Sequence, residues 1–505
     1  MGMSTSKGEI SVQNRINWIN NRAKLFPNDI AIIDADSTEK FTYEEMNERA
    51  KRLARFLYAK GVRKGDRIAL LAPNHVSYFD LLFASMHIGS IFVPLNWRLS
   101  SDELYFVIHD CSPSLIFIHD TLLNEYDWIK EKEIVPIKNN DYIEKNYTND
   151  ELPQVDLYEK DPLAMIYTGG TTGNPKGAVL SYQSIFWNAI NTIVSWNLEK
   201  DDVTLTTIPM FHTGGLNALS IPVLIIGGTV VIRSSFKPEV AIEDLINYDC
   251  TIVLFIPTMY HMIIQTEQFK KAQFPKMKVF LSGGAPCPLT IYDAFHQKGL
   301  KFKEGFGLTE AGPNNFYIDP EKAKIKRGSV GKSMMFNDIK IVNDNGEEVD
   351  YNEVGELWLK GYHLFEYYWN NEEATLDVYE GDWFKTGDLA RYDEDGYVYI
   401  SGRKKEMIIS GGENVYPLEI EHWLQSHEWI NEVAVIGVPD EMVVAYISFN
   451  GEKLSEEELI SYCEKKLTRY KIPKKFIAID DIPKTHVSKI DKKALIEYFQ
   501  LLRQE

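Results

Sequence analysis

The sequence predicts an α/β protein with a large N-terminal domain of doubly wound sheets, a β-barrel-like subdomain within it, and a small α+β C-terminal domain. The chain has 505 residues, which is too long for one compact core. Apolar strand-like runs alternate with helix-like segments in its first third and again between residues 228 and 285, as in mostly parallel sheets. Between residues 339 and 400, short alternating strands separated by turn signals predict antiparallel β structure.

The first third of the chain contains a well-marked helix. Thr42 is a good N-cap residue and Glu45 follows three positions later, so the pair predicts a capping box and a helix that runs to about Lys60. Buried strands are expected at residues 67–71 and 91–95, with a second helix between them. A strand, a helix and another strand in this order predict the βαβ unit of a parallel sheet.

The same alternation of strands and helices returns in the middle of the chain. Apolar runs bounded by glycine and proline predict strands at residues 229–232, 251–256 and 278–281. After the antiparallel region, Ser455 begins a second capping box and predicts a helix near the C-terminus.

The boundary between the two domains is expected near residue 402, where the alternating strands end and a mixture of helices and strands resumes. The N-terminal domain then spans residues 1–402 and the C-terminal domain spans residues 403–505. About a hundred residues remain for the smaller unit, which is a normal size for a domain.

Composition excludes several classes of partner. The formal net charge is −19, with 73 acidic residues against 54 basic ones, so the surface repels nucleic acid and anionic lipid. The longest apolar stretch, residues 218–232, is interrupted by proline and glycine and is too short to cross a bilayer, so we expect no integral membrane segment. The four cysteines show no metal or redox spacing, which favours a reduced, cytoplasmic location.

The strongest chemical signal is the segment 167–177, which follows an apolar strand-like run. Its glycines let several backbone N–H groups converge on an anion, its hydroxyls add donors, and its lysine adds a positive charge. A flexible surface loop is the alternative, but a linker has no need of so many hydroxyls and a lysine. A Walker-type phosphate loop is disfavoured, because Gly177 rather than serine or threonine follows Lys176.

This segment resembles the phosphate-binding signature of the adenylate-forming superfamily, which includes acyl-CoA synthetases, non-ribosomal adenylation domains and firefly-type luciferases. Further segments match other signatures of that superfamily in the same order, and the resemblance covers nearly the whole chain. These segments are residues 305–310, 355–361, 386–388, 402–403 and 409–417. The resemblance implies that the protein uses ATP and Mg²⁺. Coenzyme A is the expected co-substrate, because no carrier domain follows residue 505 in this sequence.

The resemblance also assigns a set of nucleotide-binding residues. Gly283, Gly284 and Ala285 are expected to line the adenine and the acyl pocket through their backbone, and Phe306 is expected to pack on adenine. The nucleotide-binding residues that the resemblance implies are Thr168, Gly169, Gly170, Thr171, Thr172, Gly173, Lys176, Gly283, Gly284, Ala285, Gly305, Phe306, Gly307, Thr309, Asp388, Arg403 and Lys489.

Metal and ribose binding are expected from acidic residues within these motifs. The resemblance makes Thr309 and Glu310 the metal residues, and a carboxylate suits Mg²⁺, which prefers few carboxylates together with phosphate oxygens. Asp388 lies at a turn, where its carboxylate can accept both ribose hydroxyls. The family places an arginine like Arg403 near the ribose and the α-phosphate.

Four residues are expected to take part in catalysis: Lys489, His212, Glu310 and Lys176. By resemblance, Lys489 reaches into the cleft, where its ammonium neutralises the charge that builds up when a carboxylate attacks the α-phosphate. His212 matches a residue beside the acyl carboxylate, and Lys405 matches the hinge about which relatives swing the C-terminal domain. Two features depart from the family pattern: Ser488 replaces a glycine, and the segment after Glu441 is shortened.

These observations predict an acid–thiol ligase that forms an acyl-adenylate and then transfers the acyl group to coenzyme A. A medium- or long-chain fatty acid is the favoured acid, because residues 213–217 and 256–260, where we expect the pocket, are mostly apolar or small. No aspartate follows Phe211, which argues against an amino acid substrate, since a buried ammonium without a partner is costly. The alternatives are an acyl-AMP ligase that loads a carrier protein, an aryl-acid–CoA ligase, a luciferase-like oxygenase, and a non-catalytic relative that senses nucleotide. The sequence does not specify the oligomeric state, for which a homodimer is one candidate.

Overall fold

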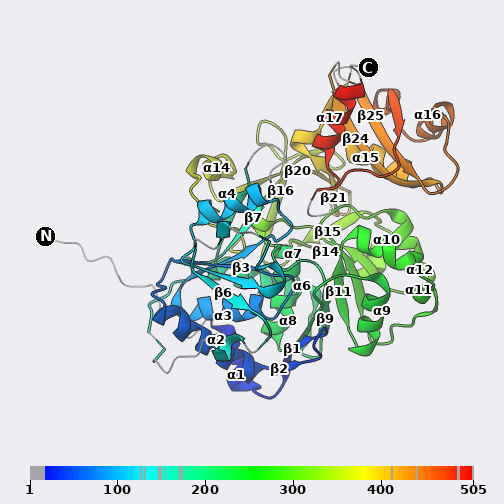
Figure 1. Cartoon of the computed structure of the whole chain (residues 1–505). Helices are drawn as coiled ribbons and strands as arrows, with labels where there is room; N and C mark the ends of the chain where they lie inside the picture. Colours follow the sequence, from blue (N-terminus) through cyan, green and yellow to red (C-terminus); the bar gives the residue numbers. More distant parts are fainter. Residues whose placement is uncertain are drawn as a thin grey trace.

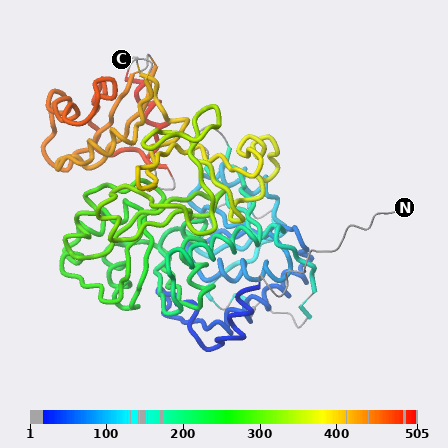
Figure 2. The backbone as a smooth tube through the Cα atoms, turned by 180° about the vertical axis from the view of Figure 1, so that it is seen from behind, coloured from blue at the N-terminus to red at the C-terminus, as the bar shows by residue number. Residues whose placement is uncertain are grey.

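The computed structural model describes residues 17–125, 128–129, 132–140, 142–145, 151–152, 154–169, 174–410, 413–439, 442–485 and 490–502. Sheets and helices before residue 404 form the larger part of the molecule, and a smaller part, coloured orange to red, lies at one end of it (Figure 1). The view from behind shows the same two parts (Figure 2).

The first sheet is almost entirely parallel. Its strand order is β13-β12-β11-β9-β10-β1-β2, and only the pair β1–β2 is antiparallel. Three strands predicted from the sequence lie in it. The strand predicted at residues 251–256 is shorter by one residue at each end, and the strand predicted at residues 278–281 is shifted by one residue. The strands are β1 (Ile30–Asp34), β2 (Lys40–Thr42), β9 (Val203–Thr206), β10 (Thr229–Ile232), β11 (Ile252–Phe255), β12 (Val279–Ser282) and β13 (Phe302–Glu304).

The second sheet has the order β18-β8-β7-β4-β3-β5-β6. Strands β7, β4, β3, β5 and β6 are parallel, whereas β8 runs antiparallel to both of its neighbours. The strands are β3 (Arg67–Leu71), β4 (Ile91–Leu95), β5 (Leu115–His119), β6 (Ile134–Ile137), β7 (Pro162–Thr168), β8 (Lys176–Ser181) and β18 (Tyr367–Tyr368).

The third sheet is antiparallel throughout, as the turn signals predict. The expected barrel-like subdomain is a sheet of order β14-β15-β21-β20-β17-β16 with β19 beside β20. The strands are β14 (Phe316–Tyr317), β15 (Ser329–Ser333), β16 (Asp338–Val342), β17 (Gly355–Lys360), β19 (Tyr379–Glu380), β20 (Trp383–Tyr392) and β21 (Val398–Arg403).

Helices connect these strands, and some of them pack between the first two sheets while others cover one sheet only. The predicted capping box is present: the Thr42 side chain accepts from the N–H of Glu45, and the helix ends before Gly61, whose φ of 88° suits glycine. Residues of both sheets and of helices α2, α3 and α8 belong to one hydrophobic cluster. The helices are α1 (Trp18–Leu25), α2 (Tyr43–Ala59), α3 (Ser77–Ile88), α4 (Ser101–Cys111), α5 (Tyr142–Lys145), α6 (Tyr182–Trp196), α7 (Thr213–Leu216), α8 (Ser220–Ile226), α9 (Pro238–Asn247), α10 (Pro257–Gln265), α11 (Glu267–Lys271), α12 (Leu289–Gln297), α13 (Pro320–Ala323) and α14 (Glu372–Asp377), with 3₁₀ turns η2 (Asp120–Leu122) and η4 (Thr309–Ala311).

The C-terminal part has its own hydrophobic clusters, which consist of residues from Ile408 onward. Strand β24 pairs antiparallel with β25, and β25 pairs parallel with β26. The second capping box, at Ser455, is also confirmed. The elements are η5 (Lys404–Glu406), β22 (Ile408–Ser410), β23 (Glu413–Val415), α15 (Pro417–Gln425), β24 (Ile430–Val438), β25 (Met442–Phe449), α16 (Glu456–Glu464), η6 (Arg469–Lys471), β26 (Lys475–Ala478) and α17 (Lys492–Leu502).

The apolar stretch 218–232 forms α8 and β10, as expected for a buried helix and strand. None of the helices in the described residues is both long and apolar enough for a membrane span.

Candidate active site

The glycine- and threonine-rich segment joins two paired strands. Strand β7 ends at Thr168 and β8 begins at Lys176, and these two residues are direct partners in the antiparallel pair. The Thr168 hydroxyl donates a hydrogen bond of 3.3 Å to the carbonyl oxygen of Lys176. Among the described residues, no heavy atom lies within 4 Å of a Cβ atom placed at Gly169. Gly170, Thr171, Thr172 and Gly173 were also expected to bind phosphate, and they lie outside the described residues.

The lysine of this segment lies close to the expected metal carboxylate, and a tyrosine lies between them. The Lys176 ammonium is 5.0 Å from the centre of the Tyr368 ring, a cation–π distance. The Tyr368 hydroxyl donates to Oε1 of Glu310 at 2.8 Å. Burial raises the pKa of Tyr368, and the Glu310 charge raises it further, so the phenol keeps the proton that it donates. Lys176 and Glu310 therefore share one neighbourhood, although the sequence separates them widely.

Backbone hydrogen bonds hold this arrangement together. The N–H of Phe365 donates to the Glu310 carbonyl oxygen at 2.7 Å, and the N–H of Trp369 donates to the Gly177 carbonyl oxygen at 2.7 Å. The segment 365–369, which contains β18 and Tyr368, is thus attached both to the 3₁₀ turn η4 and to β8.

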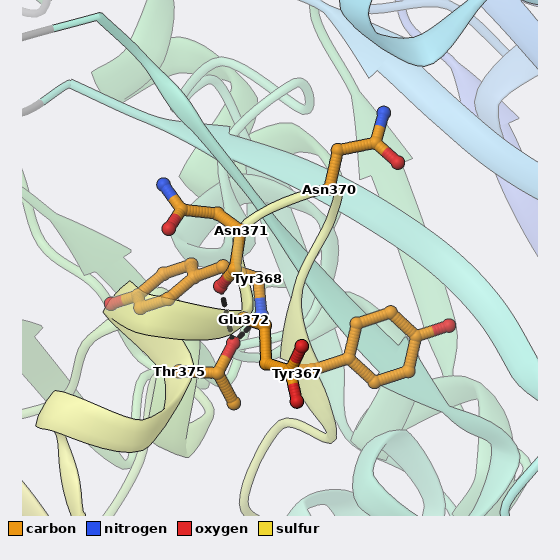
Figure 3. Close-up of a pocket in the computed structure, with 6 residues that line it drawn as sticks. All are labelled: Tyr367, Tyr368, Asn370, Asn371, Glu372 and Thr375. Atoms are coloured by element: carbon orange, nitrogen blue, oxygen red, sulfur yellow. Dashed lines mark hydrogen bonds between the residues drawn. The ribbon is translucent and has the colours of Figure 1, made fainter.

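Tyr368 is also one of six residues that line a cavity of about 430 Å³ next to α14 (Figure 3). Its backbone N–H donates to the Thr375 hydroxyl at 3.0 Å, and that hydroxyl donates to the Asn371 carbonyl oxygen at 2.8 Å (Figure 3). These bonds connect β18 to the N-cap residue and the first turn of α14. The other lining residues are Tyr367, Asn370 and Glu372.

An aspartate and an arginine lie opposite each other in the third sheet. Asp388 was expected at a turn but lies within β20, where it is the direct antiparallel partner of Arg403 of β21. Nε of Arg403 is 2.8 Å from Oδ1 of Asp388. Asp388 is buried, with 4% of its surface exposed, and its N–H donates to the Thr386 hydroxyl at 3.0 Å. The arginine keeps this buried carboxylate paired, as buried charge requires.

Lys405 follows Arg403 in the 3₁₀ turn η5 and faces the same region. Burial lowers the pKa of the Lys405 ammonium, the charges of Arg403 and Lys176 lower it further, and Glu406 and Asp388 oppose this. The residue expected at the hinge therefore lies within electrostatic reach of the phosphate-loop lysine and the expected ribose residues.

The glycine segments meet at the carboxyl ends of two parallel strands. Gly283 and Gly284 follow β12, and Gly305 follows β13. The N–H of Gly305 donates to the Ser282 carbonyl oxygen at 2.8 Å. Gly284 has a φ of 83°, which favours glycine, and Ala285 comes next in the chain. A Cβ atom at Gly307 would overlap the carbonyl oxygen of Pro313, so a larger residue there requires the backbone to move. Carboxyl ends of parallel strands are where open α/β sheets bind ligands.

The Phe306 side chain is half-buried and packs against the hydrophobic core. Its ring meets that of Phe316 edge to face, with 5.8 Å between the centroids. The Phe306 carbonyl oxygen accepts from the N–H of Asn315 at 3.1 Å, which fixes the backbone beside Gly305 and Gly307. The adenine contact that the resemblance implies stays a prediction.

His212 precedes α7, and its ring lies 4.6 Å from that of Phe211. The segment before it is held by Asn74, which follows β3 and is buried with 6% of its surface exposed. The Asn74 side chain accepts from the N–H of Met210 at 2.8 Å and donates to the Ile208 carbonyl oxygen at 3.0 Å. A buried side chain from the second sheet thus fixes a loop of the first sheet.

The last expected catalytic residue, Lys489, lies outside the described residues, as do Ser488 and Glu441. On either side of it, Lys484 and Ile490 form an isolated antiparallel bridge, and the N–H of Asp491 donates to the Pro483 carbonyl oxygen at 2.8 Å.

The geometry thus gathers Lys176, Glu310, Asp388, Arg403 and Lys405 near one another. Sequence reasoning missed two residues that organise this region. For Tyr368 no motif carried a signal, because an aromatic residue in a short strand is usually part of a core. Asn74 carries a signal, since a polar residue shortly after a buried parallel strand often faces a site.

The carboxylate chemistry fits Mg²⁺. Among the described residues, no group of three histidine, cysteine, aspartate or glutamate side chains could hold a metal alone. Glu310 is a single carboxylate, 9% exposed, with one oxygen held by a neutral phenol. Such a site suits a hard cation that takes one or two carboxylates and completes its shell with phosphate oxygens and water.

Two models of protein families match this chain. The model of the AMP-binding enzyme family matches residues 19–369, and that of the AMP-binding enzyme C-terminal domain matches residues 419–489.

Named relatives are similar over nearly their whole length. The chain is 34% identical to a feruloyl-CoA synthase from Amycolatopsis sp over 480 residues, which covers 94% of this chain and 97% of the relative. It is 33% identical to a long-chain-fatty-acid–CoA ligase from Mycobacterium tuberculosis over 496 residues, with 96% and 98% covered.

Solved structures are also similar to this chain over nearly its whole length. An O-succinylbenzoate coenzyme A synthetase from Bacillus subtilis, in complex with AMP, superposes with a TM-score of 0.85 at 30% identity and covers 95% of this chain and 98% of its own. The ATP-bound MatB from Rhodopseudomonas palustris gives a TM-score of 0.88 at 29% identity, with 95% and 99% covered. Because family models match most of the chain and relatives at 33–34% identity cover 94–96% of it, the protein belongs to the AMP-binding enzyme family.

Proposed function

We propose that this protein is an AMP-forming acid–CoA ligase. The observation that carries the proposal is the meeting of Lys176, Tyr368 and Glu310 beside the Asp388–Arg403 pair. This arrangement offers a cation for phosphate, a carboxylate for Mg²⁺ and a carboxylate for ribose within one region. Relatives with feruloyl-CoA synthase and CoA ligase activities, and a structure described as bound to ATP and magnesium, support the proposal.

The first half-reaction joins the acid to AMP. An oxygen of the acid's carboxylate attacks the α-phosphorus of ATP, the bond to the bridging oxygen breaks, and pyrophosphate leaves. Lys176 and Arg403 offset the negative charge of the phosphates, and Lys489 offsets the charge that develops at the α-phosphate. Mg²⁺, when bound by Glu310 with the neighbouring Thr309, supplies a further positive charge to the phosphate oxygens.

The second half-reaction transfers the acyl group to a thiol. The sulfur of coenzyme A attacks the acyl carbon, AMP leaves with the bonding electrons, and the thiol proton passes to solvent. We propose that the C-terminal domain, residues 403–505, moves relative to residues 1–402 between the two steps, with Lys405 as its hinge. The place of Lys405 in the chain supports this, since η5 connects the last strand of the third sheet, β21, to the first strand of the C-terminal part, β22.

The acid is an acyl or aryl carboxylate. The sequence favours a medium- or long-chain fatty acid, but an aryl acid is supported equally well, because the relatives include feruloyl-CoA, indoleacetate–CoA and fatty-acid–CoA enzymes. We propose that His212 lies beside the acid's carboxylate. Asn74 supports this role, because its hydrogen bonds give the segment before His212 a fixed position.

The experiment that tests the function supplies ATP, Mg²⁺ and coenzyme A with a panel of fatty and aryl acids, and measures AMP and thioester separately. Both products with one class of acid are expected. AMP without thioester contradicts the choice of coenzyme A and favours an acyl-AMP ligase that loads a carrier protein. If the protein forms no AMP and shows no acid-dependent exchange of pyrophosphate into ATP, the whole proposal is wrong.

We propose a cytoplasmic location because the cysteines form no disulfide bonds. Cys111, Cys250, Cys287 and Cys463 are free thiols and all are buried, as expected for a chain that folds under reducing conditions. The homodimer stays a candidate, and light scattering on purified protein tests it.

A further inference from the structure

Tyr368 contacts both of the charged groups that the proposed reaction needs at the phosphates. Its hydroxyl is 2.8 Å from Oε1 of Glu310, and the face of its ring lies 5.0 Å from the Lys176 ammonium. The side chain is buried, with 7% of its surface exposed. The two groups come from different parts of the chain: Lys176 begins β8 and Glu310 lies in η4.

The backbone gives Tyr368 little freedom to move. It pairs with Ala178 in the next strand, and its N–H donates to the Thr375 hydroxyl at 3.0 Å. Its ring also lies 4.8 Å from that of Phe365, the residue whose N–H donates to the Glu310 carbonyl oxygen. A side chain fixed in this way can hold a flexible carboxylate and a flexible ammonium at a set separation.

We propose that Tyr368 is a positioning residue: its hydroxyl orients the Glu310 carboxylate for Mg²⁺, and its ring orients the Lys176 ammonium for the phosphates. The inference rests on the proposed function and extends it. A hydroxyl that donates to one carboxylate oxygen leaves the other oxygen to the cation, and outer contacts of this kind typically change metal affinity by about 10–100-fold. Without the hydroxyl, the carboxylate rotates more freely and loses a donor.

The two contacts can be separated by substitution. Tyr368→Phe removes the hydroxyl and keeps the ring, so the concentration of Mg²⁺ that gives half-maximal adenylation is expected to rise about tenfold, while the affinity for ATP in the presence of EDTA stays unchanged. Tyr368→Leu removes the ring as well. The affinity for ATP in EDTA is then expected to fall by about two- to fivefold, which is the effect of losing one exposed to partly buried cation–π contact.

A neighbouring tyrosine supplies a matched control. The Tyr379 hydroxyl donates to the Phe365 carbonyl oxygen at 2.6 Å, so Tyr379→Phe removes a hydroxyl from the same aromatic group without a change at a carboxylate. The Mg²⁺ requirement of Tyr379→Phe is expected to equal that of the wild type. An equal rise in both variants would show a general loosening of the region and would overturn the inference.

A double variant tests whether Tyr368 acts through Glu310. Glu310→Gln is expected to weaken binding of MgATP, measured calorimetrically, and the addition of Tyr368→Phe to Glu310→Gln is expected to change that affinity less than twofold. A further tenfold loss would contradict the inference. The comparison still tests the inference if Tyr368→Phe alone does not fold. In the double variant the side chain at position 310 is a neutral amide, so no buried charged oxygen is left without a hydrogen-bond donor.

Failure of this inference and failure of the proposed function give different results. If the wild-type protein forms no acyl-adenylate with any acid, the function is wrong. If the wild type is active and Tyr368→Phe has the wild-type Mg²⁺ requirement, only the role of Tyr368 is wrong.

Discussion

Asn74 gives the most direct test of how the two parallel sheets build one site. Its side chain makes hydrogen bonds with the N–H of Met210 at 2.8 Å, the Ile208 carbonyl oxygen at 3.0 Å and the Arg233 carbonyl oxygen at 3.2 Å. Asn74→Ala removes all of these bonds and leaves the partners buried or partly buried. At about 1 kcal/mol net for each bond, and more where a partner stays unsatisfied, we expect a loss of about 3–5 kcal/mol in stability.

A unit of about 400 residues changes its melting temperature by about 1 °C per kcal/mol, so thermal melting should show a decrease of about 3–5 °C. Because the affected segment leads to His212, the KM for the acid is expected to rise more than the KM for ATP. Asn47→Ala is the control: Asn47 is equally buried, but its amide has one long hydrogen bond, of 3.4 Å, to Asn20. Less than 1 °C of change in Asn74→Ala, together with unchanged KM values, would refute the reasoning.

Three further predictions follow from the site and the core. Lys489→Ala should slow adenylation by about 10²–10³, as for the loss of one preorganised donor, and unchanged pyrophosphate exchange would show that another residue has this role. Gly307→Ala should abolish nucleotide binding or folding, because its Cβ overlaps the Pro313 carbonyl oxygen. Gly169→Ala should fold normally, since no atom of the described part of the chain lies within 4 Å of its Cβ, and calorimetric titration with ATP compares the two variants. Burial lowers the pKa of Lys303 to about 7, so that, as the pH rises, the folded protein loses this proton before the unfolded chain does. Lys303→Met should therefore raise the melting temperature most at or below about pH 7, and the difference from the wild type should shrink from about pH 7 to about pH 10. A difference that stays constant with pH would contradict the assignment.

The features predicted correctly from the sequence depend on residues that are neighbours along the chain. The capping boxes at Thr42 and Ser455 formed where they were expected, because the N-cap and the glutamate three positions later satisfy each other's backbone donors in any helix. The parallel and antiparallel sheets also follow the predicted pattern, since alternating hydrophobicity and turn residues act over a few positions. The family resemblance added the expected site residues, motif by motif.

What the sequence could not determine depends on contacts between distant segments. Tyr368 lies 58 residues from Glu310, and Asn74 lies 136 residues from Met210, yet each pair is joined by a direct hydrogen bond. The pairing of β18 with β8 and the packing of two sheets around shared helices create these contacts, and no local pattern encodes them. The sequence by itself thus determined the elements, the glycine-rich loop and the charged candidates. Only the tertiary structure decided which of them meet, because side chains from separate strands come within hydrogen-bond distance only after the sheets have packed.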